Sequence, residues 1–390
     1  MRINNFIKFI FLFLAFDNFS YAQKKDTSGI EDPLYEKPFI LKIGSLQLGG
    51  YADFSYEFEE KDGGKEESTF KASRFNIFAY TKLYERATIF SEIEFEEGGE
   101  KISLEIAQLD FKIIDELNFR GGIILPPLGR FNVNHDSPKN NFTRRPLVST
   151  EIIPSTLSEL GGGFFGNIFL NNTIRLNYNL YLTNGFNDGI LLNNAGSTRF
   201  RGGEPSLGQD NNAVPSYTGR IGLIPIKGID VGFSFHHGIY NVYELEGNIV
   251  DDKRNETLLV FDWDLTKQFK FGTFNLSGEL AYAKIDVPES LIGTFAHRQQ
   301  GIYSDLSFDF LKGLVKALPK SYFTIVMRYD EINLDRDING DDTKQISFGL
   351  NFRPFQDTVF KLNYSKARSF DRLKNKSDRV FISGSIATYF

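Results

Sequence analysis

The 390-residue chain has no cysteine, so no disulfide bond can stabilise its fold. Without thiolates, and with four histidines that show no ligand spacing, it also lacks the residues from which zinc sites are usually built. Long apolar runs are missing as well. After the first 22 residues, no stretch approaches the ~18 consecutive apolar residues that a membrane-spanning helix needs. If the chain crosses a membrane, it must therefore do so as a closed β-barrel, in which strands satisfy each other's backbone hydrogen bonds.

An excess of basic charge is also missing. The formal net charge is −6, and it becomes −7 without the first 22 residues, because two basic residues and one acidic residue leave with them. A mildly acidic protein repels a phosphate backbone, so the sequence predicts no nucleic acid among its partners.

The first residues have the composition of an export signal. Arg2 and Lys8 precede the apolar run 11–16, and small residues follow at Ser20 and Ala22. This apolar core is too short to span a bilayer, which is typical of a cleaved secretory signal peptide. We therefore expect residues 1–22 to be removed. Residues 23–44 are polar and show no period, so we expect them to form a short periplasmic N-terminal segment.

From residue 46 onward, apolar and polar residues alternate in segment after segment. In one late segment, Ile346, Phe348 and Leu350 alternate with Ser347 and Gly349. An α-helix would place these apolar residues on opposite sides, because two steps rotate by about 200°, whereas a strand places them on one face. About sixteen such segments can be counted between residues 45 and 390.

The connections between these segments alternate in length, as periplasmic turns alternate with outer loops in membrane barrels. The short joints are expected near Glu85, Asp115, Asn171, Lys227, Thr266 and Gln356. A change in the alternation also predicts a β-bulge near Ala107. The sequence thus predicts an all-β fold, a transmembrane antiparallel up-and-down β-barrel of about 16 strands. A soluble β-sandwich, whose strands also alternate, is the alternative.

The last of these segments, residues 380–390, ends the chain on Phe390. Val380, Ile382 and Ile386 share one face with Phe390, and small residues occupy much of the other. This segment resembles the C-terminal targeting signal of bacterial outer-membrane barrels, whose final strand closes against the first. The resemblance implies a location in the outer membrane of a Gram-negative-type bacterium, in contact with the lipid bilayer.

Two further segments resemble the phosphate-selective porin O and P family. They are LDFKIIDELNFRGGIILPPLGRF at residues 109–131 and MRYDEINLDRDINGDDTKQISFGLNFRPFQDTVFKLNYSKA at residues 327–367. The resemblance implies a porin, which is a water-filled channel for passive diffusion of small hydrophilic solutes. It also implies an anion bias toward phosphate-like ions and assembly as a homo-oligomer, a trimer in that family.

One connection is too long for a spare loop. Residues 127–156 lie between two strand segments, and connections of this size are usually functional. The segment resembles the constriction loop that folds into a porin lumen, where basic residues would attract small anions. Its candidate pore-constriction residues are Arg130, His135, Lys139, Arg144 and Arg145. Alternatively, these charges only hold the loop against wall carboxylates such as Glu92 and Glu94.

Charged residues also fall on the lumen-facing positions of the predicted strands. They would form a solvated lining and a transverse field, and some of them would set ion selectivity. The predicted wall residues are Glu92, Glu94, Arg120, Arg175, Arg220, Asp262, Arg328 and Arg353.

An acidic stretch in an expected outer loop matches the beginning of a calcium-binding loop. Asp335, Asp337, Asn339 and Asp341 offer oxygen ligands around the turning residue Gly340. The usual closing glutamate is missing, so a loosely bound Ca²⁺ and a simple solvated turn are alternatives. No other cofactor is expected.

Two other functional classes are open. An outer-membrane hydrolase would need a nucleophile, a base and an orienting group at one site, and no such spacing stands out, so no enzymatic activity is expected. A non-conducting surface protein would instead bind a partner through the long connections 185–216 and 240–255.

The barrel hypothesis makes a direct prediction about the isolated protein. The polypeptide without residues 1–22 should stay dispersed only in detergent or lipid, and its far-ultraviolet circular dichroism should show β-structure. A helical spectrum, or a monodisperse protein in plain buffer, would contradict a transmembrane barrel.

Overall fold

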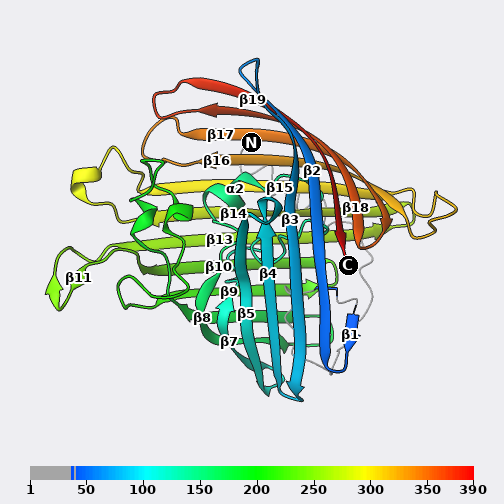
Figure 1. Ribbon diagram of the computed structural model, residues 1–390, viewed down its shortest axis with the longest axis horizontal. Coiled ribbons are helices and arrows are strands. Elements are labelled where there is room, and N and C mark those ends of the chain that lie inside the picture. Colours follow the sequence, from blue (N-terminus) through cyan, green and yellow to red (C-terminus); the bar gives the residue numbers. More distant parts are fainter. Residues whose placement is uncertain (1–36, 39–40) are drawn as a thin grey trace.

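The computed structural model describes residues 37–38 and 41–390, and sixteen strands form one closed antiparallel barrel (Figure 1). Each strand pairs with the next along the chain. The barrel strands are β2 (Leu46–Lys61), β3 (Gly64–Tyr84), β4 (Ala87–Glu96), β5 (Lys101–Ile114), β6 (Leu117–Ile124), β7 (Glu159–Phe169), β8 (Arg175–Thr183), β9 (Ser216–Ile226), β10 (Ile229–Ile239), β13 (Asn255–Phe269), β14 (Gly272–Ile285), β15 (Arg298–Phe310), β16 (Tyr322–Asn333), β17 (Asp342–Phe355), β18 (Thr358–Phe370) and β19 (Lys376–Tyr389). The predicted fold class and number of strands are confirmed.

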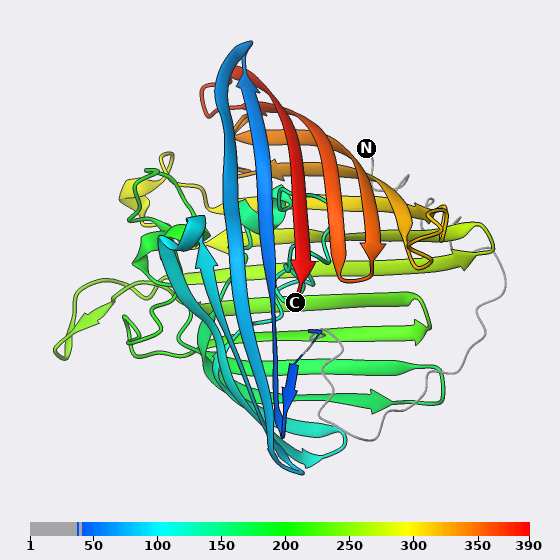
Figure 2. The ribbon, with the colours of Figure 1, turned by 45° about the vertical axis from the view of Figure 1, so that its right-hand side comes forward.

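The barrel closes where β19 meets β2. Tyr389 pairs with Tyr51, and the backbones of Phe390 and Gly50 exchange two hydrogen bonds of 2.9 Å. The Phe390 ring stacks on that of Phe75 in β3, with 5.3 Å between the ring centroids. Figure 2 shows β19 running beside β2, with the C-terminus at its end. The last strand therefore closes against the first barrel strand, as its sequence pattern predicts.

Several short elements complete the structure. They are β1 (Leu41–Ile43), η1 (Glu97–Gly99), α2 (Leu147–Glu151), η2 (Asp188–Ile190), η3 (Phe200–Gly203), the hairpin β11 (Glu244–Leu245) and β12 (Asn248–Ile249), and η4 (Glu289–Leu291). β1 pairs with β2, although the sequence predicts little structure there. The predicted signal peptide, residues 1–22, and most of the N-terminal segment lie outside the described residues. No helix in the described part of the chain is long and apolar enough to cross a bilayer.

The two ends of the barrel carry connections of different length. Turns of two residues join β3 to β4, β9 to β10 and β17 to β18 at the end that holds Phe390, which we call the turn end. Longer connections, including residues 184–215 and 240–254, lie at the opposite end, the loop end. The two ends follow the predicted alternation of short and long connections, except for the long connection 311–321 at the turn end and the two-residue turn 62–63 at the loop end.

The turn predicted near Thr266 is wrong. β13 continues to Phe269, which pairs with Gly272, so residues 270–271 form the turn. Lys267 and Gln268 resemble a polar turn in the sequence but complete the strand. The sequence did locate the bulge closely: it falls at Glu105, where Leu104 and Ile106 pair with consecutive residues of β4.

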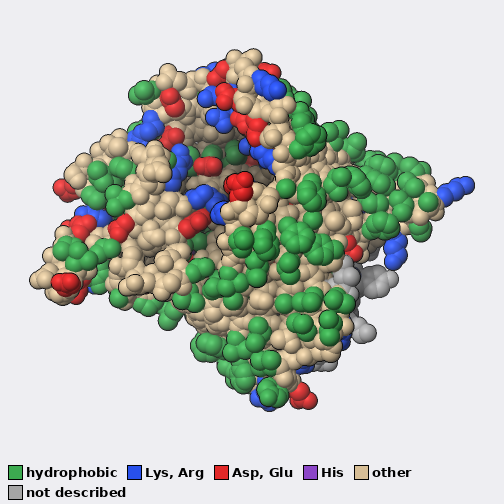
Figure 3. Space-filling view, viewed as in Figure 1, with side chains coloured by type: hydrophobic (Ala, Val, Ile, Leu, Met, Phe, Trp, Pro, Cys, Tyr) green, Lys and Arg blue, Asp and Glu red, His purple; other side chains and the backbone are tan. Residues whose placement is uncertain are grey.

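Along the strands, buried and exposed side chains alternate as predicted. In β4, Thr88, Glu92 and Glu94 are buried and point into the barrel, whereas Ile89 and Ile93 are exposed on its outer face. Figure 3 shows hydrophobic side chains spread over the outer face and charged side chains gathered around a hollow in its upper half. An apolar outer face and a polar interior are typical of barrels that span a membrane.

Part of the interior is apolar, and the sequence did not predict this. Inward-facing side chains of β13 and β14 pack against α2 and the connection 184–215. Members of this core are Leu128, Val148, Ile152, Ile153, Phe186, Ile190, Phe200, Leu258, Val260, Ala281, Ala283 and Ile285. The run 258–261 is apolar on both faces of β13, so a period of two could not show that its inner face is also packed.

Two strand glycines provide a matched test of packing around the barrel. A Cβ at Gly163 would overlap the backbone oxygen of Leu180, whereas a Cβ at Gly384 would meet its nearest atom, the backbone oxygen of Lys361, at 3.8 Å. We expect Gly163→Ala to lower the free energy of unfolding by about 1–3 kcal/mol, because the strand must shift. Gly384→Ala should change it by less than about 0.5 kcal/mol. Urea titration in lipid vesicles measures both, and equal effects would contradict the packing described.

Candidate functional site

The connection between β6 and β7, residues 125–158, lies inside the barrel, and we call it the inner segment. Most of its residues are buried, among them Asn132, Asp136 and Ser149. Its backbone and side chains contact inward-facing residues from strands on several sides of the barrel. The contacted wall residues include Asp53, Glu105, Ser234, Glu279, Asp330, Asn351, Arg353, Lys361, Asn363 and Ser385.

A single asparagine joins the two ends of the inner segment. The Asn132 side-chain amide donates hydrogen bonds to the carbonyl oxygens of Pro126, at 2.8 Å, and Leu157, at 3.1 Å. Its side-chain oxygen accepts a hydrogen bond of 2.8 Å from the backbone N–H of Leu157. Because Asn132 is fully buried, the loss of these bonds would leave unsatisfied polar groups in the interior.

A wall carboxylate binds two separate parts of the inner segment. Glu279 on β14 accepts hydrogen bonds from the backbone N–H of Phe131, at 2.6 Å, and from the Ser149 hydroxyl, at 3.1 Å. Gly129 has a φ of +71°, and a Cβ there would lie 2.6 Å from the Glu279 carboxylate. Only glycine fits both the left-handed backbone and the close approach.

The short helix α2 sits within the barrel, visible between the walls in Figure 1. It packs against β14, β15 and β16, and a Cβ at Gly301 of β15 would lie 2.9 Å from the Val148 side chain. At its beginning, the backbone N–H of Leu147 donates a hydrogen bond of 3.0 Å to the Asp330 carboxylate. The helix is therefore held by packing on one side and by a wall carboxylate at its first turn.

The predicted constriction residue Arg130 is bound to the wall. Its guanidinium lies 2.5 Å from Asp230, 3.8 Å from Asp262 and 3.9 Å from Asp264. Burial alone would lower the pKa of Arg130, but these carboxylates outweigh that effect and raise the pKa. The arrangement matches the alternative in which the basic residues hold the loop against carboxylates of the wall. For Arg130 the main partner is Asp230.

His135 is also enclosed rather than open to solvent. Its Nδ1 lies 2.9 Å from the Asn132 carbonyl oxygen, and its Nε2 lies 2.7 Å from the Glu105 carboxylate. Burial lowers the pKa of His135 to about 4, although the nearby Asp136 opposes the shift. The imidazole is therefore neutral at pH 7 and adds no positive charge to the interior.

Three predicted constriction residues border open space. Lys139 lines a cavity of about 880 Å³ at the turn end. Arg144 lies with its guanidinium 3.9 Å from the centre of the Phe381 ring. Arg145 donates one hydrogen bond of 2.9 Å to the Ser155 carbonyl oxygen, and burial together with nearby Arg74 lowers its pKa to about 10.

Two cavities at the loop end, of about 750 and 730 Å³, share part of their lining. Arg145 and Glu151 of the inner segment border both cavities, as do Arg74 and Glu96 of the wall. Arg144 borders the second cavity, which also has the carboxylates of Asp53, Glu57, Glu97 and Glu100 in its lining. Basic side chains of the inner segment thus face carboxylates of β2, β4 and η1, while β3 adds the basic residues Lys71 and Arg74 to the same lining.

The predicted wall residues lie on the inner face of the barrel, and most of them have compensating partners. Arg120 binds Asp110 through two hydrogen bonds of 2.8 and 2.9 Å. The remaining contacts are Arg220 with Asp262, Arg328 with Asp305, Arg353 with the Pro138 carbonyl oxygen, Glu94 with Arg74, and Glu92 with Asn76. Arg175 lies half-buried at the beginning of β8. Much of the predicted basic lining is therefore neutralised locally.

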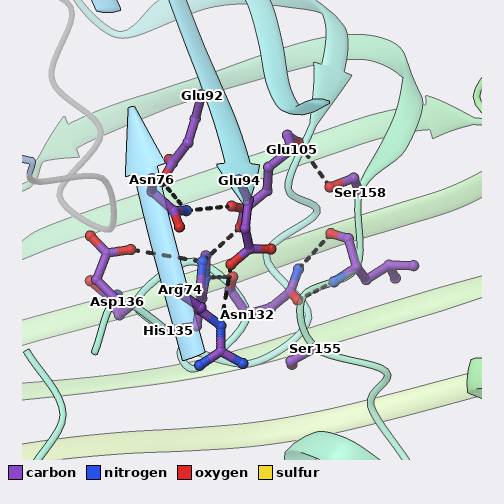
Figure 4. A network of polar contacts seen from close by, with 12 residues as sticks. Arg74, Asn76, Glu92, Glu94, Glu105, Asn132, His135, Asp136, Ser155 and Ser158 are labelled. Carbon is purple, nitrogen blue, oxygen red and sulfur yellow. Dashed lines mark hydrogen bonds and ion pairs between the residues drawn. The ribbon is translucent and has the colours of Figure 1, made fainter. Parts of the chain in front are cut away.

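The sequence missed a buried polar cluster between the inner segment and β3–β5 (Figure 4). Asn76 donates hydrogen bonds to Glu92, at 2.9 Å, and to Glu105, at 3.2 Å. Lys37, from the stretch before β1, places its Nζ 2.6 Å from Asp136 and 2.9 Å from Glu92. The alternation of β3 and β4 could have placed Asn76 beside Glu92. No sequence signal placed Lys37 there, because the stretch around it has no period.

Two of the four predicted calcium ligands lie in ion pairs. Asp335 is 2.7 Å from Arg372, and Asp337 is 2.5 Å from Arg298. Within residues 37–38 and 41–390, no group of three or more histidine, cysteine, aspartate or glutamate side chains is placed to hold a metal. Loose binding of Ca²⁺ by Asp335, Asp337, Asn339 and Asp341 stays a prediction.

The role of Asn132 is open to direct test. Asn132→Ala removes three hydrogen bonds worth about 1 kcal/mol each, so the inner segment should open far more often. We expect limited proteolysis of the folded barrel to cut within residues 125–158 at least about tenfold faster. Asn134→Ala is the matched control, because the Asn134 side chain makes only two longer hydrogen bonds, of 3.3 and 3.4 Å. Equal cleavage rates in the two variants would contradict the role assigned to Asn132.

No protein-family model matches the chain. An uncharacterized protein of Aquifex aeolicus (strain VF5) is 26% identical over 370 residues, which cover 90% of this chain and 82% of that protein. The anion-selective porin of Comamonas acidovorans superposes with a TM-score of 0.58 at 10% identity, over 89% of this chain and 99% of that one. The outer-membrane channel DcaP of Acinetobacter baumannii superposes with a TM-score of 0.56 at 12% identity, over 88% of this chain and 97% of that one. OprB of Pseudomonas putida superposes with a TM-score of 0.53 at 11% identity, over 89% of this chain and 94% of that one. The chain thus has the fold of outer-membrane porins, while its resemblance to the phosphate-selective O and P family stays a prediction.

Proposed function

We propose that the protein is an outer-membrane porin, a water-filled channel through which small hydrophilic solutes diffuse passively. The observation that carries this proposal is the closed barrel with an apolar outer face and charged cavities at both ends of its interior. Proteins described as outer-membrane porins and channels share its fold, which supports the same role. In this proposal the turn end faces the periplasm, the loop end faces the outside, and the protein catalyses no reaction.

The inner segment would act as the constriction of this channel. It fills one side of the interior with an apolar core, so solutes would pass on the other side, along β2–β5. There Arg144 and Arg145 face carboxylates of the wall, an arrangement that orients a dipolar solute without binding it tightly. Weak binding suits passive diffusion, since a solute must leave as readily as it enters.

An anion bias would have to come from Arg144, Arg145 and Lys139. Arg130 is paired with Asp230, and the buried His135 is neutral. The acidic wall opposite the two arginines works against a strong preference for anions. We therefore propose a modest bias at most, in a homo-oligomer that is a trimer by analogy with the resembling family.

One observation favours a second function, the binding of a partner at the cell surface. The β11–β12 hairpin projects from the loop end, and Leu245, Ile249 and Val250 are 56%, 81% and 54% exposed. Exposed apolar side chains on a projecting hairpin are a common feature of contact surfaces. Deleting residues 244–249 should leave conductance unchanged if the hairpin only binds a partner.

Planar-bilayer recording tests the channel and its selectivity. The purified protein should give discrete conductance steps. In a salt gradient, Arg144→Ala combined with Arg145→Ala should shift the reversal potential toward cations, by about twofold or more in the permeability ratio, because two positive charges leave the passage. Arg86→Ala, in an exposed turn at the turn end, is the matched control. Folded protein without any conductance would reject the porin proposal.

A further inference from the structure

Lys37 precedes the barrel in the sequence, yet its side chain reaches into the interior. Its Nζ lies 2.6 Å from Asp136 of the inner segment and 2.9 Å from Glu92 of β4. The Lys37 side chain is 3% exposed, and those of Glu92 and Asp136 are 0% and 1% exposed. An ammonium group buried this deeply is stable only where carboxylates surround it.

The group around Lys37 has the form of a cage for one cation. Asn76 links Glu92 to Glu105, so three carboxylates from β4, β5 and the inner segment gather at one place. The Phe78 ring closes one side, with its centre 5.5 Å from the Lys37 Nζ. A compact ammonium group with three N–H donors suits this setting, in which it contacts Glu92 and Asp136 directly and faces an aromatic ring.

The same cage holds the inner segment in place. One oxygen of Asp136 accepts from Lys37, and the other accepts a hydrogen bond of 2.7 Å from the Tyr389 hydroxyl of β19. Burial alone would lower the pKa of Lys37, but the charges of Asp136, Glu92 and Glu105 outweigh it and raise the pKa. Lys37 is therefore charged, and its charge offsets the repulsion between the Asp136 and Glu92 carboxylates.

We propose that Glu92, Glu105 and Asp136 form a binding site for a primary ammonium group, and that Lys37 occupies it as a tethered ligand that latches the inner segment inside the barrel. The N-terminal stretch thereby controls a segment about a hundred residues away in sequence, since Lys37 and Asp136 are 99 positions apart. Without Lys37, the buried carboxylates repel one another and Asp136 moves away from Glu92, which releases the segment. A small free alkylammonium ion then takes the vacant place and restores docking.

The absence of native cysteine makes docking measurable with a single introduced thiol. Val133 of the inner segment is 2% exposed, in a cluster with Tyr51, Phe78 and Tyr389. In the full barrel in detergent, Val133→Cys should react slowly with a charged methanethiosulfonate reagent. Adding Lys37→Met should raise the labelling rate by about tenfold or more, the scale expected when a buried ion pair loses one member. Lys42→Met is the matched control, because Lys42 on β1 is exposed.

Ethylammonium chloride should return the Lys37→Met protein to slow labelling, whereas tetramethylammonium chloride at the same concentration should not, because it has no N–H donor. An unchanged labelling rate in Lys37→Met, or equal effects of the two salts, would overturn the proposal.

A second variant keeps the test valid if Lys37→Met folds poorly. Asp136→Asn keeps the side-chain shape and removes the charge that Lys37 binds on the inner segment. It should also raise the labelling rate. In the double variant, Lys37→Met with Asp136→Asn, the rate should rise by much less than the product of the two single increases. An increase equal to that product would show that the two residues are not coupled, and it would overturn the latch. Labelling does not depend on conduction, so a barrel that carries no current but labels as expected would end the channel proposal and leave the latch intact.

Discussion

Backbone groups of a strand in a lipid bilayer must find their hydrogen-bond partners within the protein, and a closed ring of strands provides them. In this chain the ring depends on one seam, where β19 pairs with β2 and Phe390 exchanges hydrogen bonds with Gly50. An open seam would expose two strand edges to the bilayer. The seam also brings Tyr389 next to Asp136, so closure of the wall and placement of the inner segment are linked.

A ring of sixteen strands encloses more space than its own side chains fill. The inner segment occupies that space in two different ways. On the side of β13–β16 it adds Val148, Ile152 and Ile153 to an apolar core, which resembles the interior of a soluble protein. On the side of β2–β5 it adds Leu125 and Val133 to a smaller apolar cluster, meets carboxylates and leaves charged cavities. The interior is therefore asymmetric, and the proposed path for solutes lies on its polar side.

Pairing of charges explains why the predicted basic lining does not become a ladder of free cations. Arg120, Arg220 and Arg328 each bind a neighbouring aspartate through two hydrogen bonds. A buried arginine without such a partner would cost several kcal/mol. Each of these arginines therefore has an aspartate partner on a strand of the same wall. Charge available to a passing solute is limited to residues at cavity borders, such as Arg144 and Arg145.

Sequence pattern alone predicted the strands, their number, a bulge within two residues of its place at Glu105 and the closing role of the last strand, because a period of two is a local property that each strand carries in its own residues. It failed at Thr266, where polar strand residues resemble a turn, and at residues 258–261, where both faces are apolar. The folded structure was needed to show that Arg130 and His135 are enclosed while Arg144 and Arg145 border cavities, and that Lys37 reaches Asp136. These contacts join positions far apart in the chain, and they depend on the closure of the ring and on the path of the inner segment within it, which no local pattern encodes.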